Sequence, residues 1–340
     1  MVPDTLKDQQ LLANKYSRRD LFVCDIVDVV LKDVMQEMEH PFYSLSKKPV
    51  MTIREYKHGN HWLKITPSVQ GLATIYDKDL LIYVISQLVA KLNQGEEIHP
   101  RVRINCHEFL LFTNRGTGGK DYKALVNTLE RLRGTTISTN IITGDEEQIE
   151  VFGLIDRGTV RRKYGFDGRL LWVDIVLSDW VFNAIKAKEV LTLNRGYFRL
   201  SKPYERRAYE IARKHCGHNK EWKVGLELLH KKMGVTSPFK KFRFFIKKLT
   251  NSDHLPSYTV ELTEADQVIF RKRKTALSRP ALSSEAYEHA KKYTGRESVY
   301  AWEQDWIQFW RDSGCSTLKS ADAAFIGFCK SRSVQLCGKV

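Results

Sequence analysis

The side chains with the most suggestive chemistry lie in the stretch SPFKKFRFFIKKL, residues 237–249. At the 100° per residue of an α-helix, five cations fall on one face of this stretch, and no anion accompanies them. They are Lys240, Lys241, Arg243, Lys247 and Lys248. Like charges four residues apart repel each other, so a face of one sign is unusual for a helix that meets only water. Such a face favours insertion into the major groove of DNA.

The chemistry of each side chain predicts its role on DNA. The planar fork of Arg243 can bind O6 and N7 of guanine together, which makes it the best candidate to read a base. Lys247, Lys248 and Arg206 are expected to contact the phosphate backbone. Phe244 lies at the centre of the cationic face. It either touches a thymine methyl group or packs on a wing or a neighbouring domain, and the sequence leaves both open.

Two signals predict the element that positions this face. The opposite face is apolar and is expected to be buried; it consists of Phe239, Phe242, Phe245, Ile246 and Leu249. Gly234 predicts the end of a preceding helix, VGLELLHKKM, and Thr236 or Ser237 can cap the next helix before Pro238. Ser237 is also a candidate DNA contact at the start of that helix. Residues 224–250 therefore read as two helices joined by a tight turn.

Composition supports a polyanionic partner. The chain has 340 residues and a net charge of +15, and residues 201–280 hold 19 Lys and Arg against 8 Asp and Glu, a surplus of 11. A generally basic soluble protein is the alternative reading of this charge. The six cysteines form no CxxC pair, and we see neither a signal peptide nor an apolar run that could span a membrane. We therefore expect a cytoplasmic protein with reduced thiols.

The order of predicted elements repeats along the chain. The first half contains predicted helices at 77–93, 105–113 and 120–134, a hairpin of strands at 135–142 and 148–156, a basic loop at 157–163, and a strand at 169–177. The second half contains predicted helices at 202–217, 224–234 and 237–249 and a hairpin at 255–273. Helices followed by a hairpin are typical of a winged helix. We predict an α+β fold with two tandem winged-helix domains and a small helical C-terminal extension.

The predicted domain boundaries follow from this repeat. They are an N-terminal lead at 1–17, a first winged-helix domain at 18–190, a second at 191–270, a linker at 271–284 and the helical extension at 285–340. In the first domain, four residues lie off the apolar stripe of the helix and are candidates to contact a second DNA segment: Lys120, Lys123, Asn127 and Arg131. Alternatively, this domain forms a dimer interface through its long strands. Its first segment, 18–38, is predicted to include a buried helix.

Motifs for other chemistry are incomplete. The loop NRGTGGKD, residues 114–121, lacks the first glycine of a phosphate loop and has Asp121 where Ser or Thr is required. His215 and His218 lack two further metal ligands at a recognisable spacing. The acidic run at 145–150 fits a solvated hairpin tip better than a metal site. The tryptophans at 302, 306 and 310 fit the core of a helical tail better than a base-stacking platform. We therefore expect no catalytic residue, cofactor or metal.

The ordered set of segments resembles a known family. RRDLFVCDI, GLATIYDKDLLIYVISQL, LNRGYFRLSKPYERRAYEIARKHCG and AAFIGFCKSR together are similar to the plasmid replication initiator protein A family, and more distantly to tandem winged-helix Rep initiators. The resemblance implies a protein that binds directly repeated double-stranded sites at a plasmid origin, helps to open the duplex, and recruits the host initiator and replicative helicase. It also implies a monomer that initiates and a homodimer that represses its own gene.

Two other classes of function remain alternatives. A DNA nickase or primase would need a Tyr nucleophile paired with a His-hydrophobe-His metal site, a pattern we do not find around His58 and His61. A transcriptional regulator without an initiator role is harder to separate, because DNA binding alone is common to both classes. The family resemblance and the C-terminal extension favour the initiator.

Overall fold

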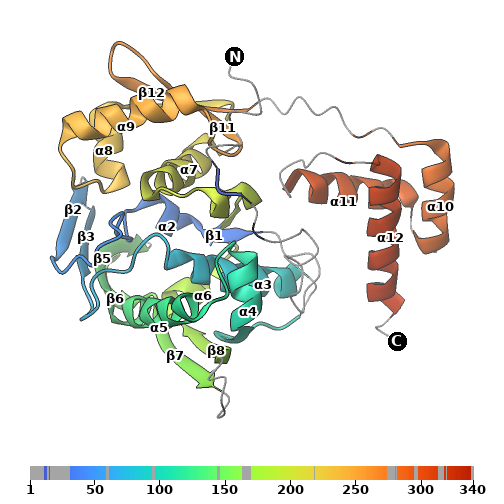
Figure 1. Ribbon diagram of the computed structural model, residues 1–340, viewed down its shortest axis with the longest axis horizontal. Helices are drawn as coiled ribbons and strands as arrows, with labels where there is room; N and C mark the ends of the chain where they lie inside the picture. Colours follow the sequence, from blue (N-terminus) through green and yellow to red (C-terminus); the bar gives the residue numbers. More distant parts are fainter. Residues whose placement is uncertain are drawn as a thin grey trace. The chain divides into compact units, whose positions relative to one another are not determined.

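The computed structural model describes residues 11–13, 15, 31–58, 61–93, 96–143, 146–162, 170–217, 219–273, 280, 282–294, 298–312, 318 and 320–337. Contacts divide the chain into two compact units, Met1–Lys272 and Arg273–Val340. Figure 1 shows the elements of both units. Among the described residues, no helix combines the length and the apolar character that a membrane span requires.

The first half of the larger unit follows the order helix, strand, helix, helix, strand, strand. Its elements are α3 (Lys78–Asn93), β4 (Arg101–Asn105), α4 (Cys106–Phe112), α5 (Gly119–Gly134), β7 (Ile155–Arg162) and β8 (Leu170–Leu177). The three strands form an antiparallel sheet in the order β4-β8-β7. The predicted helices are confirmed, but the predicted basic loop at 157–163 is wrong over most of its length, because β7 pairs with β8 there.

The second half repeats this order. Its elements are α7 (Pro203–Cys216), β10 (Glu221–Gly225), α8 (Leu226–Met233), α9 (Phe239–Ser252), β11 (Tyr258–Leu262) and β12 (Gln267–Lys272). The sheet order β10-β12-β11 matches β4-β8-β7 position by position. In both halves the strand after the first helix therefore pairs with the last strand of the hairpin, although the two halves share little residue identity.

A second hairpin interrupts only the first half. It lies between α5 and β7 and consists of β5 (Thr136–Thr143) and β6 (Glu146–Gly153). These strands join β2 (Arg54–His58) and β3 (His61–Thr66) in a four-stranded sheet of order β2-β3-β5-β6. The sequence order alone suggested that this hairpin follows the third helix as the wing. The structure corrects this, since β7 and β8 occupy the position equivalent to β11 and β12.

Short elements connect the two halves. They are β1 (Lys32–Val34), α2 (Met35–Glu39), α6 (Asp179–Lys186), β9 (Val190–Thr192) and the 3-10 turn Arg195–Arg199. Strand β1 pairs with β9. The predicted buried helix within 18–38 lies mostly outside the described residues, and its described end is a strand followed by the short α2. Leu31, Met38 and Ile82 are buried in the core of the second half, so the two halves pack together within one unit. The boundary at 190/191 stays a prediction.

The described residues of the smaller unit form three helices, α10 (Ser284–Thr294), α11 (Val299–Asp312) and α12 (Ala321–Cys337). Trp302 and Trp306 lie in its core with Phe325 and Cys329, and Trp310 is also buried. The burial of these side chains agrees with the prediction that the tryptophan row forms the interior of the tail. Part of the predicted linker, 274–279 and 281, lies outside the described residues.

A buried ion cluster ties the two halves together around Lys78 at the start of α3. Its Nζ lies 2.6 Å from Asp33 Oδ2, 3.4 Å from Glu210 Oε1 and 3.9 Å from Glu37 Oε2, and all four side chains are essentially fully buried. Arg207 adds a second cation, 3.1 Å from Glu210. Three carboxylates therefore face two cations, which leaves one excess negative charge in the protein interior. Such a cluster favours retention of one proton.

The stability of the protein should therefore decrease as the pH rises through neutrality. Burial, together with Glu37 and Glu210 and against the opposing effect of Lys78, raises the pKa of Asp33 from 3.8 to about 8. The folded state keeps a proton that the unfolded chain releases above about pH 4, so this contribution is complete below that pH and is lost as the pH rises through about 8.

Urea denaturation at pH 6.5 and 8.5 measures this effect. The free energy of unfolding should be lower at pH 8.5 for the wild type, and the difference should shrink in Asp33→Asn. Burial lowers the pKa of His215 from 6.5 to about 4, so this group changes stability mainly between those values, and it does so equally in the wild type and in Asp33→Asn. Equal differences in the two proteins would show that the cluster holds no such proton.

Candidate nucleic-acid interface

The turn before α9 is set by Gly234. This residue ends α8 in the left-handed region at φ 66°, as the sequence predicted. A Cβ at this position would lie 2.5 Å from Cβ of Pro41, so only glycine fits. The predicted cap is wrong in detail: Pro238 is the N-cap of α9, and no side chain caps it. Ser237 is half-buried, and its carbonyl oxygen lies 3.0 Å from Nε2 of His230.

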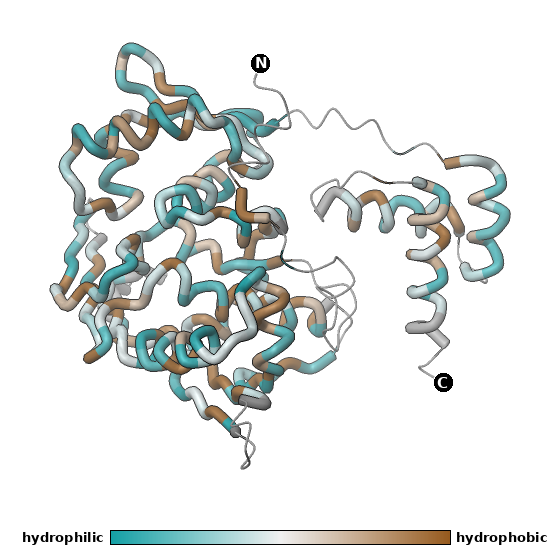
Figure 2. Tube along the Cα trace, in the orientation of Figure 1, coloured by the Kyte–Doolittle hydropathy of each residue, from teal (hydrophilic) through white to brown (hydrophobic). Residues whose placement is uncertain are grey.

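The apolar face of α9 fixes which side chains reach the surface. Phe242, Ile246 and Leu249 are buried in the core of the second half, as predicted, whereas Phe245 is half-buried and Phe239 is exposed, contrary to the prediction. Hydrophobic and hydrophilic residues alternate along this helix in Figure 2, as expected for an amphipathic segment. Because the buried side chains recur every three or four residues, the remaining face points outward as a single strip.

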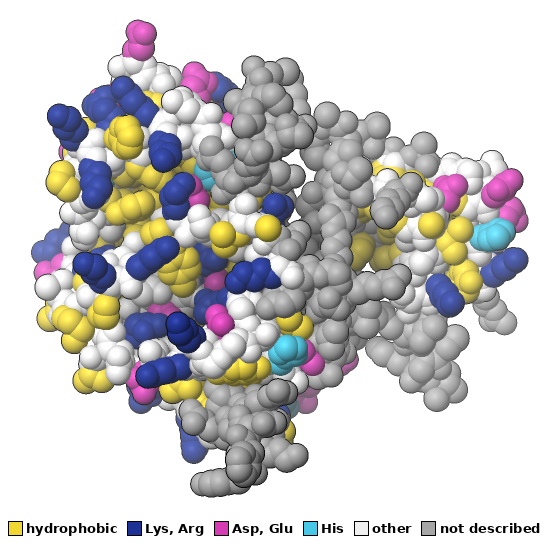
Figure 3. All heavy atoms as spheres, in the orientation of Figure 1, with side chains coloured by type: hydrophobic (Ala, Val, Ile, Leu, Met, Phe, Trp, Pro, Cys, Tyr) yellow, Lys and Arg dark blue, Asp and Glu magenta, His cyan; other side chains and the backbone are white. Residues whose placement is uncertain are grey.

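Four lysines and one phenylalanine form that outward strip, which we call the α9 face: Lys240, Lys241, Phe244, Lys247 and Lys248. All five side chains are exposed, and Phe244 is 68% exposed. None of the four lysines has an ion pair with another described residue. In Figure 3, Lys and Arg side chains gather over α9 and again over α5 on the same side of the larger unit. The α9 face is therefore available to a polyanion.

Arg243 differs from these lysines because it already has a partner. Its guanidinium forms a two-point ion pair with Asp266, which lies just before β12. It also lies over the ring of Phe239, 5.5 Å from the centroid. Both charged side chains are more than one-third exposed, so the ion pair is screened by water and can exchange. A guanine contact by Arg243 requires this exchange.

The candidate DNA-binding residues of α5 also include exposed side chains and one side chain that already has an ion-pair partner. Lys120 and Lys123 are exposed, and Asn127 is half-buried. Arg131 is bound to Asp77 at 2.7 Å through both Nε and a terminal nitrogen, and its side chain is 18% exposed. Arg131 therefore fixes α5 against the start of α3, and the exposed lysines are available cations of this helix.

Arg206 is a correction to the sequence-based assignment. It was expected to contact phosphates, but it is 4% exposed and lies inside the larger unit. It donates 2.9 Å to the carbonyl of Leu200 and 2.6 Å to Oδ1 of Asp79. Its guanidinium also stacks near Tyr76 and Tyr197. Counting charge along a helix cannot distinguish a surface cation from one that has a buried carboxylate as its partner.

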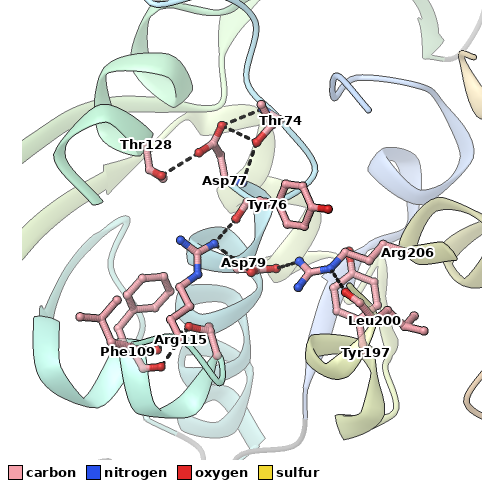
Figure 4. Close-up of polar contacts among 12 residues, drawn as sticks. Thr74, Tyr76, Asp77, Asp79, Phe109, Arg115, Thr128, Tyr197, Leu200 and Arg206 are labelled. Carbon is pink, nitrogen blue, oxygen red and sulfur yellow. Dashed lines mark hydrogen bonds and ion pairs between the residues drawn. The ribbon is translucent and has the colours of Figure 1, made fainter. Parts of the chain in front are cut away.

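Two aspartates at the start of α3 hold these arginines. Figure 4 shows Asp79 with Arg206 and Arg115, and Asp77 with Thr128. Asp77 accepts hydrogen bonds from Thr128 at 2.7 Å and from Arg131. Asp79 lies 2.9 Å from Arg115 and 2.6 Å from Arg206, and is 2% exposed on its side chain. We call this pair the aspartate hub. It joins α3 to α5, to the loop before α5, and to α7 of the second half.

Sequence reasoning missed the aspartate hub. It placed Asp77 and Asp79 at the start of a predicted helix and gave neither a role in joining helices. The available signal was the spacing in Asp77-Lys78-Asp79, which alternates charge at the start of an otherwise apolar helix. An apolar helix is buried, so charges at its start need buried partners. The sequence does not show which arginines these partners are.

A cleft of about 650 Å³ opens beside the aspartate hub. Lys47, Lys48 and Tyr76 line it together with both aspartates and their arginines. Asp77, Asp79 and their arginines already bind one another, and the other charged side chains that line the cleft are three lysines and one aspartate, Lys15, Lys47, Lys48 and Asp121. The cleft therefore extends the positive surface beside α5 rather than defining a separate chemical site.

The two repeated units of helices and a three-stranded sheet, with exposed lysines on α5 and α9, define an α+β protein with positively charged helix surfaces. The family model described as Replication initiator protein A matches residues 32–260. The chain belongs to the replication initiator protein A family. It is 34% identical over 273 residues to a protein of Wigglesworthia glossinidia brevipalpis whose name assigns it to replication, an alignment that covers 79% of this chain and 99% of that protein.

Comparison with solved structures gives one likeness in fold and one more distant match. Domains 2 and 3 of RctB share 12% identity, with a TM-score of 0.52 over 69% of this chain and 97% of that chain. At this identity the likeness concerns the fold alone. The Pi initiator protein in complex with iteron DNA gives a TM-score of 0.37 and 14% identity over 51% of this chain and 80% of that chain, a likeness too distant to carry an argument.

Removal of the Asp79 carboxylate should destabilise the larger unit. Asp79→Ala would leave the guanidinium of Arg206 buried without its partner, which costs about 3–5 kcal/mol. Chemical denaturation followed by circular dichroism measures the loss. The exposed Glu264 provides a control, because Glu264→Ala should change the free energy of unfolding by less than about 0.5 kcal/mol. A small effect of Asp79→Ala would mean that water solvates Arg206.

Two phenylalanines of α9 should separate folding from binding. Phe242 is 1% exposed, so Phe242→Ala should cost about 3–5 kcal/mol of stability. Phe244 is 68% exposed, so Phe244→Ala should leave stability within about 0.5 kcal/mol and weaken binding to duplex DNA. Thermal melts and fluorescence anisotropy with a labelled duplex test the pair. Unchanged DNA affinity in Phe244→Ala would remove this residue from the interface.

Proposed function

We propose that this replication initiator acts by binding double-stranded DNA through two tandem winged-helix units. The observation that carries the proposal is the α9 face, where four exposed lysines lack ion-pair partners among the described residues. Charges of one sign on a rigid helix after a tight turn match the geometry of a helix that enters the major groove. The surplus of positive charge in residues 201–280 supports the same conclusion.

The repeated element order supports the tandem arrangement. In both halves, the third helix packs beside a sheet whose second and third strands form a hairpin, and this combination is the core of a winged helix. Helices α9 and α5 take equivalent places in the two repeats. We infer that α9 reads the specific sequence and that α5 contacts a second segment through Lys120, Lys123 and Asn127.

Base recognition by Arg243 takes the form of an exchange. In the protein without DNA, Asp266 holds the guanidinium in a two-point ion pair. A guanine offers two acceptors in a similar geometry, so DNA can replace the carboxylate without changing the number of hydrogen bonds. Asp266 then keeps the arginine extended before binding, while Lys247 and Lys248 neutralise phosphates.

The wider cellular role rests on membership of the family. We propose that the protein binds directly repeated sites at a plasmid origin, helps to open the duplex, and recruits the host initiator and replicative helicase in the cytoplasm. We further propose that a monomer initiates and that a homodimer represses the protein's own gene. The protein is proposed to perform no catalytic step, because its sequence lacks the nucleophile and metal-ligand pattern of a nickase.

Salt dependence tests the electrostatic part of this proposal. Lys247→Ala combined with Lys248→Ala should weaken binding to DNA flanking the protein's own gene. It should also reduce the slope of the logarithm of the DNA-binding constant against the logarithm of the salt concentration by about 2. Each lost phosphate contact removes about one unit of this slope. Lys91→Ala combined with Lys186→Ala removes the same charge from exposed positions on other helices. This control should keep the wild-type slope.

Footprinting and plasmid maintenance separate the candidate functions. An initiator should protect repeated sites near its gene, and the α9 double variant should fail to maintain a plasmid that depends on those sites. Protection of the promoter with normal plasmid maintenance in the variant would favour a regulator instead. Equal loss of affinity in the α9 variant and in its control would show that net charge, rather than the α9 face, determines binding.

A further inference from the structure

A second positive surface lies on the sheet β4-β8-β7, on the side away from α5. Helix α5 packs on the inner side of this sheet, where a Cβ at Gly158 would lie 3.0 Å from Leu129. Residues directly opposite each other on paired strands share one side of a sheet. The rows on the outer side are Arg101–Val176–Arg157, Arg103–Asp174–Thr159 and Asn105–Trp172–Arg161.

Four arginines therefore share one side of a small sheet, and we call this surface the arginine face: Arg101, Arg103, Arg157 and Arg161. All four are exposed; the exposed fractions of Arg101, Arg103 and Arg161 are 66%, 58% and 56%. The side chain of Arg157 has no hydrogen bond or ion pair with another described residue. Ion pairs within the protein therefore leave most of the positive charge of the arginine face available to a binding partner.

One carboxylate lies among these arginines. Asp174 is 3% exposed and lies 2.6 Å from Arg103, 3.5 Å from Arg101 and 3.9 Å from Arg161. The hydrogen bond from Arg103, with the charges of Arg103 and Arg101, holds the pKa of this carboxyl below its usual range. Arg103 also lies over the ring of Trp172 at 5.4 Å. Asp174 therefore neutralises one arginine and fixes its position, and the arginine face keeps three surplus positive charges.

The spacing of these charges matches an extended acidic chain. Residues two apart on a strand, such as Arg101 and Arg103, are about 7 Å apart, and so are alternate side chains of an extended peptide. The outer strands are about 10 Å apart, so a single segment can reach arginines from both. β4 and β7 are the edge strands of this sheet, which allows backbone pairing as well.

A DNA duplex fits this surface less well. A duplex seated on the outward side of α5 cannot reach the arginine face, because the helix and the sheet lie between them. A second duplex is convex and would offer one line of phosphates to a flat patch. We propose that the arginine face docks an extended acidic segment of a partner protein, independently of DNA binding by α9.

Fluorescence anisotropy on the full chain tests this proposal. The probe is a labelled 12-residue peptide of alternating Glu and Thr. The sheet variant combines Arg101→Gln, Arg157→Gln and Arg161→Gln and leaves the pair of Arg103 and Asp174 intact. It should bind the peptide at least tenfold more weakly than the wild type and bind duplex DNA within twofold of it.

A matched variant on α9 removes the same charge, through Lys240→Gln, Lys247→Gln and Lys248→Gln. It should lose affinity for duplex DNA and bind the peptide within twofold of the wild type. The proposal is overturned if the wild type does not bind the peptide, or if both variants lose peptide affinity equally. It is also overturned if the sheet variant loses affinity for duplex or single-stranded DNA by the same factor as for the peptide. The single variant Arg157→Gln should weaken peptide binding about threefold. Because this side chain is exposed and has no partner among the described residues, the single variant also controls for misfolding of the triple variant.

Discussion

The arrangement of the proposed interface depends on the first turn of α3. Asp77 and Asp79 lie two residues apart there and bind different partners: Asp77 holds Arg131 of α5, and Asp79 holds Arg206 of α7. A buried carboxylate that loses its cation is costly, so each contact restricts its helix strongly. Because α5 and α7 belong to different halves, one turn of helix sets where both halves lie within the larger unit. Lys78, between the two aspartates, adds the buried cluster on the other side.

The cations of this protein serve two purposes that their sequence positions do not separate. Arg131, Arg206 and Arg207 are bound by buried carboxylates or backbone oxygens and hold the helices together. The lysines of the α9 face have no such partners among the described residues. Arginine suits the first purpose because its planar fork makes several hydrogen bonds at once, whereas lysine on a flexible stem suits exposed phosphate contacts.

The two repeated halves share the same arrangement of helices and a three-stranded sheet but differ in the elements around it. In the second half, the sheet β10-β12-β11 stands alone beside its helices. In the first half, the added hairpin of β5 and β6 builds a separate four-stranded sheet with β2 and β3. Both helices in the third position, α5 and α9, still expose lysines, but α9 has more of them. The difference is consistent with unequal roles in binding.

The sequence alone determined the amphipathic helices, the glycine stop at Gly234, the cationic strip of α9 and the family. These features depend on local periodicity and on the order of segments, both of which can be read along a chain. The tertiary structure decided which charges are available: it bound Arg206 and Arg131 to aspartates far away in sequence and brought four arginines of two strands onto one face. It also decided which hairpin takes the wing position. Strand partners and buried ion pairs join residues distant in sequence, so periodicity carries no record of them.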